Sequence, residues 1–334
     1  MNTPSLALSL IILCPDAQAQ DPQAAINKAV DYLAQASLTW PIENRCFSCH
    51  NNGDTVRVLA QVEPTELRTH KDDWQATFQW LVQPHLWETS KTDEAPQNPV
   101  LAPIQFGSAL VALRQANLLS PPSQTIDETV RLIVQGPDPA GFWPVEPAGH
   151  LGSPGTFGNS LATTIAVRIL ASLAPNRAAE SIERAQQWTM QRQSRANVDL
   201  AAGILLFATD KTVSIQHQVN TWTQELIDNQ TSQGGWGPYP NRFPEIFDTA
   251  IALRALCEAP VEITPFSVLD RGQRFLLNEQ EDAGGWPETT RPSGGTSYAQ
   301  HIATSAWALD AVAAIQQRQK ERSTPTPKRN KPSQ

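Results

Sequence analysis

Two cysteines and a histidine stand together near the N-terminus, in the segment Cys46-Phe47-Ser48-Cys49-His50. In a C-x-x-C-H pattern each thiol can add to one vinyl group of the same porphyrin, because the two-residue spacer lets both sulfurs reach it. The adjacent histidine then lies under the iron as its proximal ligand. The pattern therefore predicts covalently attached haem c on Cys46 and Cys49, with His50 bound to the iron.

Three other readings of the pair stay open: a zinc knuckle, a redox dithiol and an accidental pair. Zinc would need a second pair of ligands at close spacing, and the chain has no other Cys-rich segment. A thioredoxin-like dithiol is expected in a βαβ context, which the sequence lacks. If Cys14 is removed with a leader, Cys46, Cys49 and Cys257 remain, and an odd number is a poor disulfide framework.

The N-terminus has the features of a signal peptide. Residues 6–13 are an apolar run too short to span a membrane, and Ala17-Gln18-Ala19 offers small residues to a signal peptidase, although no Lys or Arg precedes the run. We predict a signal peptide over residues 1–19 and a periplasmic or secreted bacterial protein. Haem attachment outside the cytoplasm agrees with this prediction. No other segment approaches 18 continuous apolar residues, so no transmembrane span is expected.

Charge is spread unevenly along the chain. The whole chain carries a net charge of −8, whereas residues 318–334 carry +5 and the rest carries −13. An acidic body argues against nucleic acid as a partner. The basic segment 318–334 is predicted to be a disordered tail.

A sequence motif recurs with a period of fifty residues and ends each time at a Gly-Gly turn. Looser copies end at Trp143 and Trp40. Leu226, Gln230, Gly234, Gly235 and Trp236 recur as Leu276, Gln280, Gly284, Gly285 and Trp286.

Two kinds of helix alternate along residues 20–317. Amphipathic helices are predicted at 22–36, 72–82, 125–135, 177–192, 216–230 and 265–279. Helices that are apolar nearly all round are predicted at 54–62, 104–117, 158–173, 197–208, 247–257 and 301–317. Outer amphipathic and inner apolar helices form pairs, and closing the sixth pair onto the first removes both open ends. We expect an all-α protein, an (α/α)6 toroid of six helix pairs.

The segment from Arg271-Gly272 through Phe275-Leu276 and Gln280 to Gly284-Gly285-Trp286 resembles the QW repeat of the squalene–hopene cyclase and protein prenyltransferase superfamily. The resemblance implies a toroid whose central cavity holds an isoprenoid. The chain also resembles bacterial secreted proteins that combine such a toroid with an N-terminal C-x-x-C-H. The repeat residues have a structural interpretation, in which each glutamine caps adjacent helix ends and each tryptophan packs over the turn. These residues are Gln230, Trp236, Gln280 and Trp286.

The resemblance does not extend to catalysis. The D-x-D-D motif with which the cyclases protonate their substrate is absent, and Asp72-Asp73 is expected to be a solvated pair in the first turn of a helix. The prenyltransferases bind zinc through D-x-C and a later histidine; here Asp248 and His301 match, but Ala250 stands at the cysteine position. We therefore expect no separate zinc site, and neither cyclase nor prenyltransferase activity.

Ring closure suggests a distal ligand for the iron. His50 precedes the first inner helix, and His301 begins the sixth, so closure would bring both to the same rim. His301 is the first candidate, His85 in a Pro-rich loop is the second, and an iron without a protein distal ligand is the alternative. Methionine is disfavoured because Met190, the one methionine after the leader, lies in a predicted outer helix.

Three functions remain compatible with these features. The first is electron transfer or another redox role, with a redox partner protein. The second is a haem-dependent oxidoreductase acting on an apolar, isoprenoid-like molecule in the toroid cavity. The third is a non-catalytic repeat module that binds a partner.

Overall fold

The computed structural model describes residues 20–89, 98–147, 150–289, 291 and 297–323, and this part of the chain contains helices but no strand. Six helices form an outer layer: α1 (Pro22–Asn44), α4 (Lys71–Leu81), α6 (Ser123–Val134), α8 (Ala179–Gln191), α10 (Val213–Asp228) and α12 (Phe266–Asn278). Six form an inner layer: α2 (Thr55–Val62), α5 (Leu101–Gln115), α7 (Gly158–Leu173), α9 (Asn197–Phe207), α11 (Ile246–Glu258) and α13 (Tyr298–Ser323).

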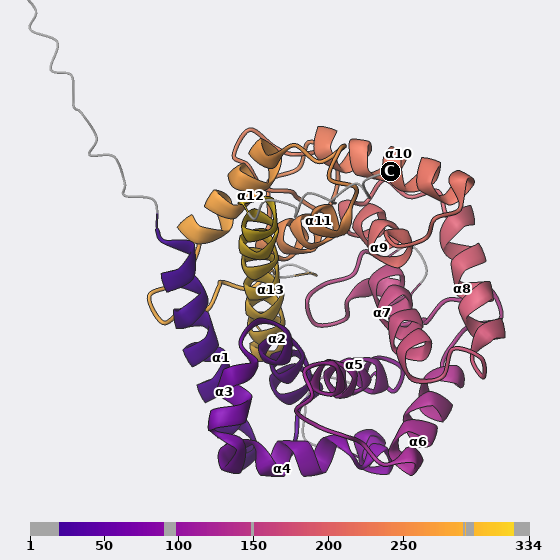
Figure 1. The fold of residues 1–334 in the computed structure, drawn as a ribbon, viewed down its shortest axis with the longest axis vertical. Coiled ribbons are helices and arrows are strands. Elements are labelled where there is room, and N and C mark those ends of the chain that lie inside the picture. The colour runs from indigo at the N-terminus through magenta and orange to yellow at the C-terminus, as the bar shows by residue number, and fades with distance from the viewer. Residues whose placement is uncertain (1–19, 90–97, 148–149, 290, 292–296, 324–334) are drawn as a thin grey trace, which may run out of the picture.

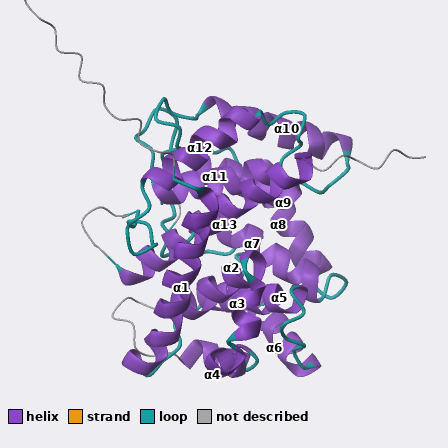
Figure 2. Ribbon diagram, turned by 60° about the vertical axis from the view of Figure 1, so that its left-hand side comes forward, coloured by secondary structure: helices purple, strands orange, loops and turns teal. Residues whose placement is uncertain are grey.

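The two layers make a ring, seen down its axis in Figure 1 and turned by 60° in Figure 2. Each inner helix packs against the next around the ring, and α13 packs against both α11 and α2. The inner helices are buried nearly all round, whereas the outer helices keep one exposed face. The predicted (α/α)6 toroid of six pairs is confirmed.

In three repeats a tryptophan in the turn between an outer and an inner helix is hydrogen-bonded to the outer helix. Its indole Nε1 donates to a carbonyl in the last turn of the preceding outer helix: Trp143 to Ile133 at 2.9 Å, Trp236 to Leu226 at 2.6 Å and Trp286 to Leu276 at 2.7 Å. All three indoles are fully buried. Because the ring nitrogen finds a partner, the large side chain can be buried without losing a hydrogen bond.

The glutamines join neighbouring repeats. Gln230 Nε2 donates to the carbonyl of Gly234 in its own turn at 2.7 Å and to the carbonyl of Val268 in α12 at 2.9 Å. Gln280 Nε2 makes the same pair of bonds, to Gly284 at 2.9 Å and to Ala25 in α1 at 2.9 Å. The last repeat is therefore bonded to the first in the same way as consecutive repeats are bonded to each other, and this closes the ring.

The structure differs from the sequence-based boundaries at two helices. α1 continues past the predicted end at 36, through Pro41, and stops at Arg45, whose φ of 56° is left-handed. α13 continues past 317 to Ser323, with Arg318 buried, so the expected tail boundary at 318 is wrong. The predicted signal peptide (1–19) and the rest of the tail (324–334) lie outside the described residues. Within the described part, no helix has the length and hydropathy needed to cross a membrane.

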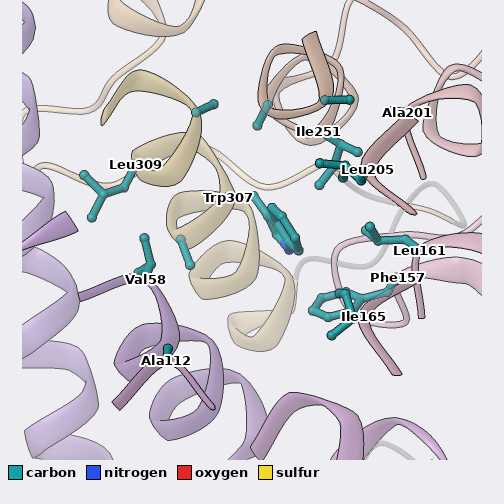
Figure 3. Packing of buried hydrophobic residues seen from close by; sticks show 14 of the residues in the cluster. Val58, Ala112, Phe157, Leu161, Ile165, Ala201, Leu205, Ile251, Trp307 and Leu309 are labelled. Atoms are coloured by element: carbon teal, nitrogen blue, oxygen red, sulfur yellow. The ribbon is translucent and has the colours of Figure 1, made fainter. Parts of the chain in front are cut away.

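Aromatic side chains project into the middle of the ring. The loop before α7 turns inward (Figure 1), and its last residue, Phe157, is buried with its ring edge-on to Trp307 of α13 at 5.8 Å between centroids. Figure 3 shows Trp307 pointing across the ring toward Leu161 and Ile165 of α7.

Candidate functional site

The C-x-x-C-H segment lies at the N-terminal end of α2. Cys46 and Cys49 are partly exposed thiols, neither of them in a disulfide, and His50 is buried. Cys49 begins a wide π-type turn, η1 (Cys49–Asp54), that leads directly into α2. Such turns are rare and often occur at functional sites. The three residues predicted to hold haem therefore lie close together in the segment that leads into the inner helix α2.

Asn52 fixes this segment to α1. Its side-chain Oδ1 accepts from the Ser48 amide at 3.0 Å, and its Nδ2 donates to the Ser37 carbonyl at 3.1 Å and hydroxyl at 3.2 Å. Both Asn52 and Ser37 are fully buried. A buried amide with all of these partners holds the backbone between the two cysteines in one conformation.

One ring nitrogen of His50 is held by the protein. Nδ1 lies 2.8 Å from Gln105 Nε2 and 3.4 Å from Asp54 Oδ2, and Gln105 Nε2 also donates to Asp54 Oδ2 at 2.8 Å. Gln105 comes from α5, the neighbouring inner helix, and both it and Asp54 are fully buried. Among the described residues the hydrogen bonds of the ring are made through Nδ1, which leaves Nε2 as the nitrogen available to a ligand.

Buried polar atoms without a hydrogen-bond partner gather around this histidine. Both side-chain polar atoms of Asn51, Oδ1 of Asp54, Oγ1 of Thr55 and Oε1 of Gln105 are in this state. Leaving such an atom unpaired costs about 1–3 kcal/mol, so native structures seldom do it without a reason. The donor set of two thiols and one oriented imidazole fits haem c, and these atoms fit a site whose partner is a bound group.

An aromatic cluster lies beside the motif. Phe47, between the two cysteines, stacks on Trp80 at 5.0 Å between ring centroids, and Trp80 contacts Phe106 edge-on at 6.2 Å. Trp87 lies 5.5 Å from Phe106 on the far side. Flat aromatic side chains are suited to packing against another flat conjugated ring.

The two candidate distal histidines have different surroundings. His301, in the first turn of α13, lies between two carboxylates, with Nε2 at 3.3 Å from Glu281 and Nδ1 at 3.4 Å from Glu288. Its ring is 5.8 Å from that of Tyr32 in α1, whose pKa is raised to about 12 by burial and by Tyr298, Glu281 and Glu288. Among the described residues no hydrogen bond, ion pair or ring contact joins His301 to His50. His301 as distal ligand stays a prediction.

His85 lies in the short helix η2 (Pro84–Thr89), where its side chain is mostly exposed and 3.9 Å from Glu128. Asp72 and Asp73 are exposed in the first turn of α4, as expected.

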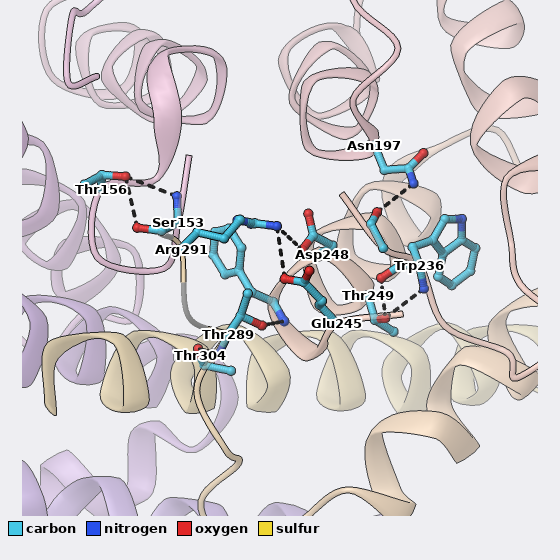
Figure 4. A network of polar contacts seen from close by, with 12 residues as sticks. Ser153, Thr156, Asn197, Trp236, Glu245, Asp248, Thr249, Thr289, Arg291 and Thr304 are labelled. Atoms are coloured by element: carbon cyan, nitrogen blue, oxygen red, sulfur yellow. Dashed lines mark hydrogen bonds and ion pairs between the residues drawn. The ribbon is translucent and has the colours of Figure 1, made fainter. Parts of the chain in front are cut away.

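Asp248 belongs to a second buried cluster, drawn in Figure 4. Its Oδ2 accepts from Arg291 Nη1 at 2.8 Å, and Glu245 Oε2 lies 3.1 Å from the same nitrogen. Two carboxylates share one guanidinium, and burial followed by the charge of Asp248 raises the pKa of Glu245 to about 7. Burial also raises the pKa of Asp248. A carboxyl that titrates near neutral pH can give or take a proton under physiological conditions.

This cluster is not arranged as a metal site. Asp248 is paired with Arg291, and His301 with Glu281 and Glu288. In the described part of the chain no group of three His, Cys, Asp or Glu side chains is close enough to bind a metal ion.

Three of the residues that build the His50 site were not found from the sequence: Asn52, Asp54 and Gln105. Gln105 had a signal, because it is a lone large polar residue in the otherwise apolar stretch from Leu101 to Leu113. A single amide inside a buried helix is expected to have a specific partner. Its partner is 55 residues away in the chain, which periodicity alone does not reveal.

No family model matches the chain, and no curated protein matches its sequence. Solved structures do share its fold. A variant of MstE, a type II terpene cyclase from Scytonema in complex with geranylgeranyl dihydroxybenzoate, superposes with a TM-score of 0.63 at 12% identity, over 89% of this chain and 98% of that one. A protein from Actinoplanes gives 0.59 at 14% identity, over 89% and 100%. A possible member of the GH105 family from Salmonella enterica gives 0.55 at 13%, over 95% and 100%. At these identities the likeness concerns the fold.

Proposed function

We propose that this protein is an exported c-type haem protein built on an α/α toroid, with a role in electron transfer or another redox process. The observation that carries the proposal is the His50 site. Cys46 and Cys49 are thiols at the rim, and the adjacent imidazole is held through Nδ1 by Gln105 and Asp54. A metal-bound histidine usually engages its second nitrogen with a carboxylate, a carbonyl or water, and this fixes the ring toward the metal.

Each residue has a defined part in this proposal. Cys46 and Cys49 would carry the two thioether bonds to haem, and His50 Nε2 would bind its iron. Asp54 would accept the Nδ1 proton of the iron-bound ring and set its basicity, and Gln105, whose Nε2 donates to Asp54, would hold that carboxylate in place. Bound haem supplies reversible one-electron transfer; the protein chain supplies the ligand, the orientation and the buried surroundings. The predicted signal peptide would direct the chain to the compartment in which haem c is attached.

A second function on the same fold is the alternative. MstE binds an isoprenoid-bearing benzoate, and a cavity of about 580 Å³ lies inside the ring of this protein. A haem-dependent oxidoreductase acting on an apolar molecule is therefore the alternative to pure electron transfer. The absence of D-x-D-D and Ala250 at the zinc-cysteine position argue against cyclase and prenyltransferase chemistry.

The experiment is export of the full-length chain in cells that carry a cytochrome c maturation system. We expect covalent haem, detected by peroxidase staining of a denaturing gel, by a pyridine haemochrome spectrum and by the intact mass. Cys46→Ala and Cys49→Ala should each lose stable double attachment. Cys257→Ala is the matched control because this thiol is mostly buried, burial raises its pKa to about 12, and it lies far along the chain in α11.

A folded, exported wild type without haem would contradict the proposal. Zinc in the purified protein, or a reversible Cys46–Cys49 disulfide in its place, would identify the zinc or dithiol alternative. With haem attached, carbon monoxide separates the two functions: a difference spectrum indicates an open iron suited to an oxidoreductase, and no response indicates two protein ligands.

A further inference from the structure

The interior of the ring contains a cavity at the end away from the C-x-x-C-H segment. It has a volume of about 580 Å³ and is bounded by all six inner helices. Its wall includes Gln61, Gln115 and Thr209, which are exposed residues at the C-terminal ends of α2 and α5 and just after α9. The cavity therefore opens at the C-terminal ends of the inner helices. A cavity of this size can hold a small organic molecule.

The floor of the cavity carries a buried cation. Arg57 of α2 is 5% exposed, and its guanidinium lies over the Trp307 ring at 4.2 Å from the centroid. Its Nη1 donates to Asp310 at 2.9 Å, but Nε and Nη2 are buried and have no hydrogen-bond partner. The ion pair and the aromatic ring fix the group in one orientation, with two donors unused.

The charged side chains next to Arg57 form ion pairs with one another. Asp310 is shared, because Arg254 Nε also donates to it at 3.1 Å, and Arg254 continues to Glu258 at 2.9 Å. Glu258 in turn pairs with Arg168. Burial opposes the charge on Arg254, but Asp310 and Glu258 outweigh it and raise its pKa.

Asp210 stands at the cavity wall just past α9, where its carboxylate accepts from the Thr212 amide at 2.8 Å. No described carboxylate lies within hydrogen-bond distance of Arg57 Nε or Nη2.

The sides of the cavity are apolar. The aliphatic side chains that line it include Val111, Leu161, Ile165, Ile169, Leu205 and Leu206 of three inner helices, together with Ile182 of the outer helix α8. In Figure 3, Leu161, Ile165 and Leu205 approach Trp307 from the opposite side of the ring. Buried guanidinium donors at the floor, below apolar walls, are complementary to a molecule with an anionic end and an apolar body.

We propose that this cavity binds an organic acid, with its carboxylate on Arg57 and its hydrocarbon part between Trp307 and the aliphatic wall of α7 and α9. A carboxylate accepts two parallel hydrogen bonds from a guanidinium, which is what Nε and Nη2 of Arg57 offer. Binding would satisfy two buried donors that otherwise cost free energy. The cavity opens at the C-terminal ends of the inner helices, whereas the C-x-x-C-H segment lies at the N-terminal end of α2, so the two proposals are tested separately; Arg57, at the floor, is three residues after Asp54.

The test uses the full exported protein and three probes measured by isothermal titration calorimetry: decanoate, decanol and inorganic phosphate. We expect saturable 1:1 binding of decanoate, with decanol and phosphate each at least tenfold weaker. Phosphate binding tighter than decanoate would overturn the proposal in favour of a bare anion site. Decanol binding as tight as decanoate would overturn it in favour of an apolar pocket, and no saturable decanoate binding would overturn it altogether.

Two variants locate the site. Arg57→Met keeps the length of the side chain and leaves Asp310 paired with Arg254; we expect at least a tenfold loss of decanoate affinity. Ile165→Trp fills the apolar wall and leaves Arg57 in place, so it should also abolish binding even if Arg57→Met fails to fold. Arg177→Met, at an exposed ion pair with Asp127 outside the cavity, is the control and should bind like the wild type. Unchanged decanoate affinity in Ile165→Trp would place the ligand elsewhere and contradict the proposal.

Discussion

Gln280 Nε2 donates to the carbonyl of Ala25 at 2.9 Å, which joins two residues 255 positions apart in the chain. The equivalent bond one repeat earlier, from Gln230 to Val268, joins consecutive repeats. The ring is therefore closed by the same glutamine-to-carbonyl hydrogen bond that connects consecutive repeats. A closed ring has no terminal repeat whose apolar face must be capped.

Gly284 is the residue at which closure is most sensitive to a side chain. Its φ is +101°, and a Cβ there would lie 2.3 Å from the Lys28 carbonyl oxygen in α1. Gly284→Ala should lower the free energy of unfolding by roughly 2–4 kcal/mol, because left-handed strain adds to a backbone clash. The measurement is urea unfolding followed by circular dichroism.

Gly155→Ala is the control for this substitution. Its Cβ would meet the flexible side chain of Gln300 at 3.3 Å, and its backbone does not have a positive φ. We expect a change within about 0.5 kcal/mol. Equal stability of the two variants would show that the contact between the last turn and α1 does not hold the ring closed.

The helix pairs were predictable because their signals are local. An apolar period of 3.6 marks the helices, the Gly-Gly turns end two of the outer ones, and nearly every predicted pair agrees with the structure within a few residues. The two misplaced helix ends have tertiary causes. α1 continues through Pro41 because Trp40 stacks on Tyr298 and Ser37 is bonded to Asn52. α13 continues because Arg318 is buried and donates to the Leu256 carbonyl.

The sequence predicts the three candidate haem-binding residues but not the residues that surround them. Cys46, Cys49 and His50 form a contiguous motif whose chemistry depends on spacing alone. Gln105 contacts His50 in η1, and Arg57 contacts Asp310 in α13, at sequence separations of 55 and 253 residues. Periodicity shows that such residues lie on inner helices, but it does not show which side chains meet across the ring.

Asp54 offers a prediction about the haem-loaded protein. A carboxylate near Nδ1 makes a metal-bound imidazole a stronger electron donor and stabilises the oxidised iron. Asp54→Asn should therefore raise the reduction potential while covalent attachment is retained. Spectroelectrochemical titration measures it, with Asp73→Asn, an exposed change in α4, as the control. A potential equal to that of the wild type would mean that Asp54 does not act on the iron ligand.

His301 supplies a second spectroscopic prediction. If it is the distal ligand, His301→Ala should convert a low-spin haem spectrum to high-spin, whereas His85→Ala should leave the spectrum unchanged. His301 must then leave Glu281 and Glu288, to which it is 3.3 and 3.4 Å away. An unchanged spectrum for His301→Ala would exclude it as the ligand, and a change on His85→Ala alone would assign the second candidate.

Glu245 predicts how stability changes with pH. Its pKa is raised to about 7 in the folded protein, above its ordinary value of 4.5, because it is buried beside Asp248. The folded state then binds more protons than the unfolded state between about pH 4.5 and 7, so this group makes the protein less stable as the pH rises through that window. Glu245→Gln keeps the Asp248–Arg291 pair and removes the second negative charge. We expect the variant to gain stability over the wild type on going from pH 5 to pH 8, on the order of 1 kcal/mol, because Glu245 is partly exposed to solvent.

Urea unfolding at both pH values measures this difference, and Glu180→Gln serves as the control because Glu180 is an exposed carboxylate on α8. Groups that titrate identically in the variant and the wild type contribute equally to the stability of both, so the difference in unfolding free energy reports on Glu245. The sign of the change in this stability difference tests the prediction. If the variant loses stability relative to the wild type as the pH rises, Arg291 stabilises the Glu245 carboxylate more than burial and Asp248 destabilise it. The cluster would then be a structural ion pair, and Glu245 would not serve as a proton donor near neutral pH.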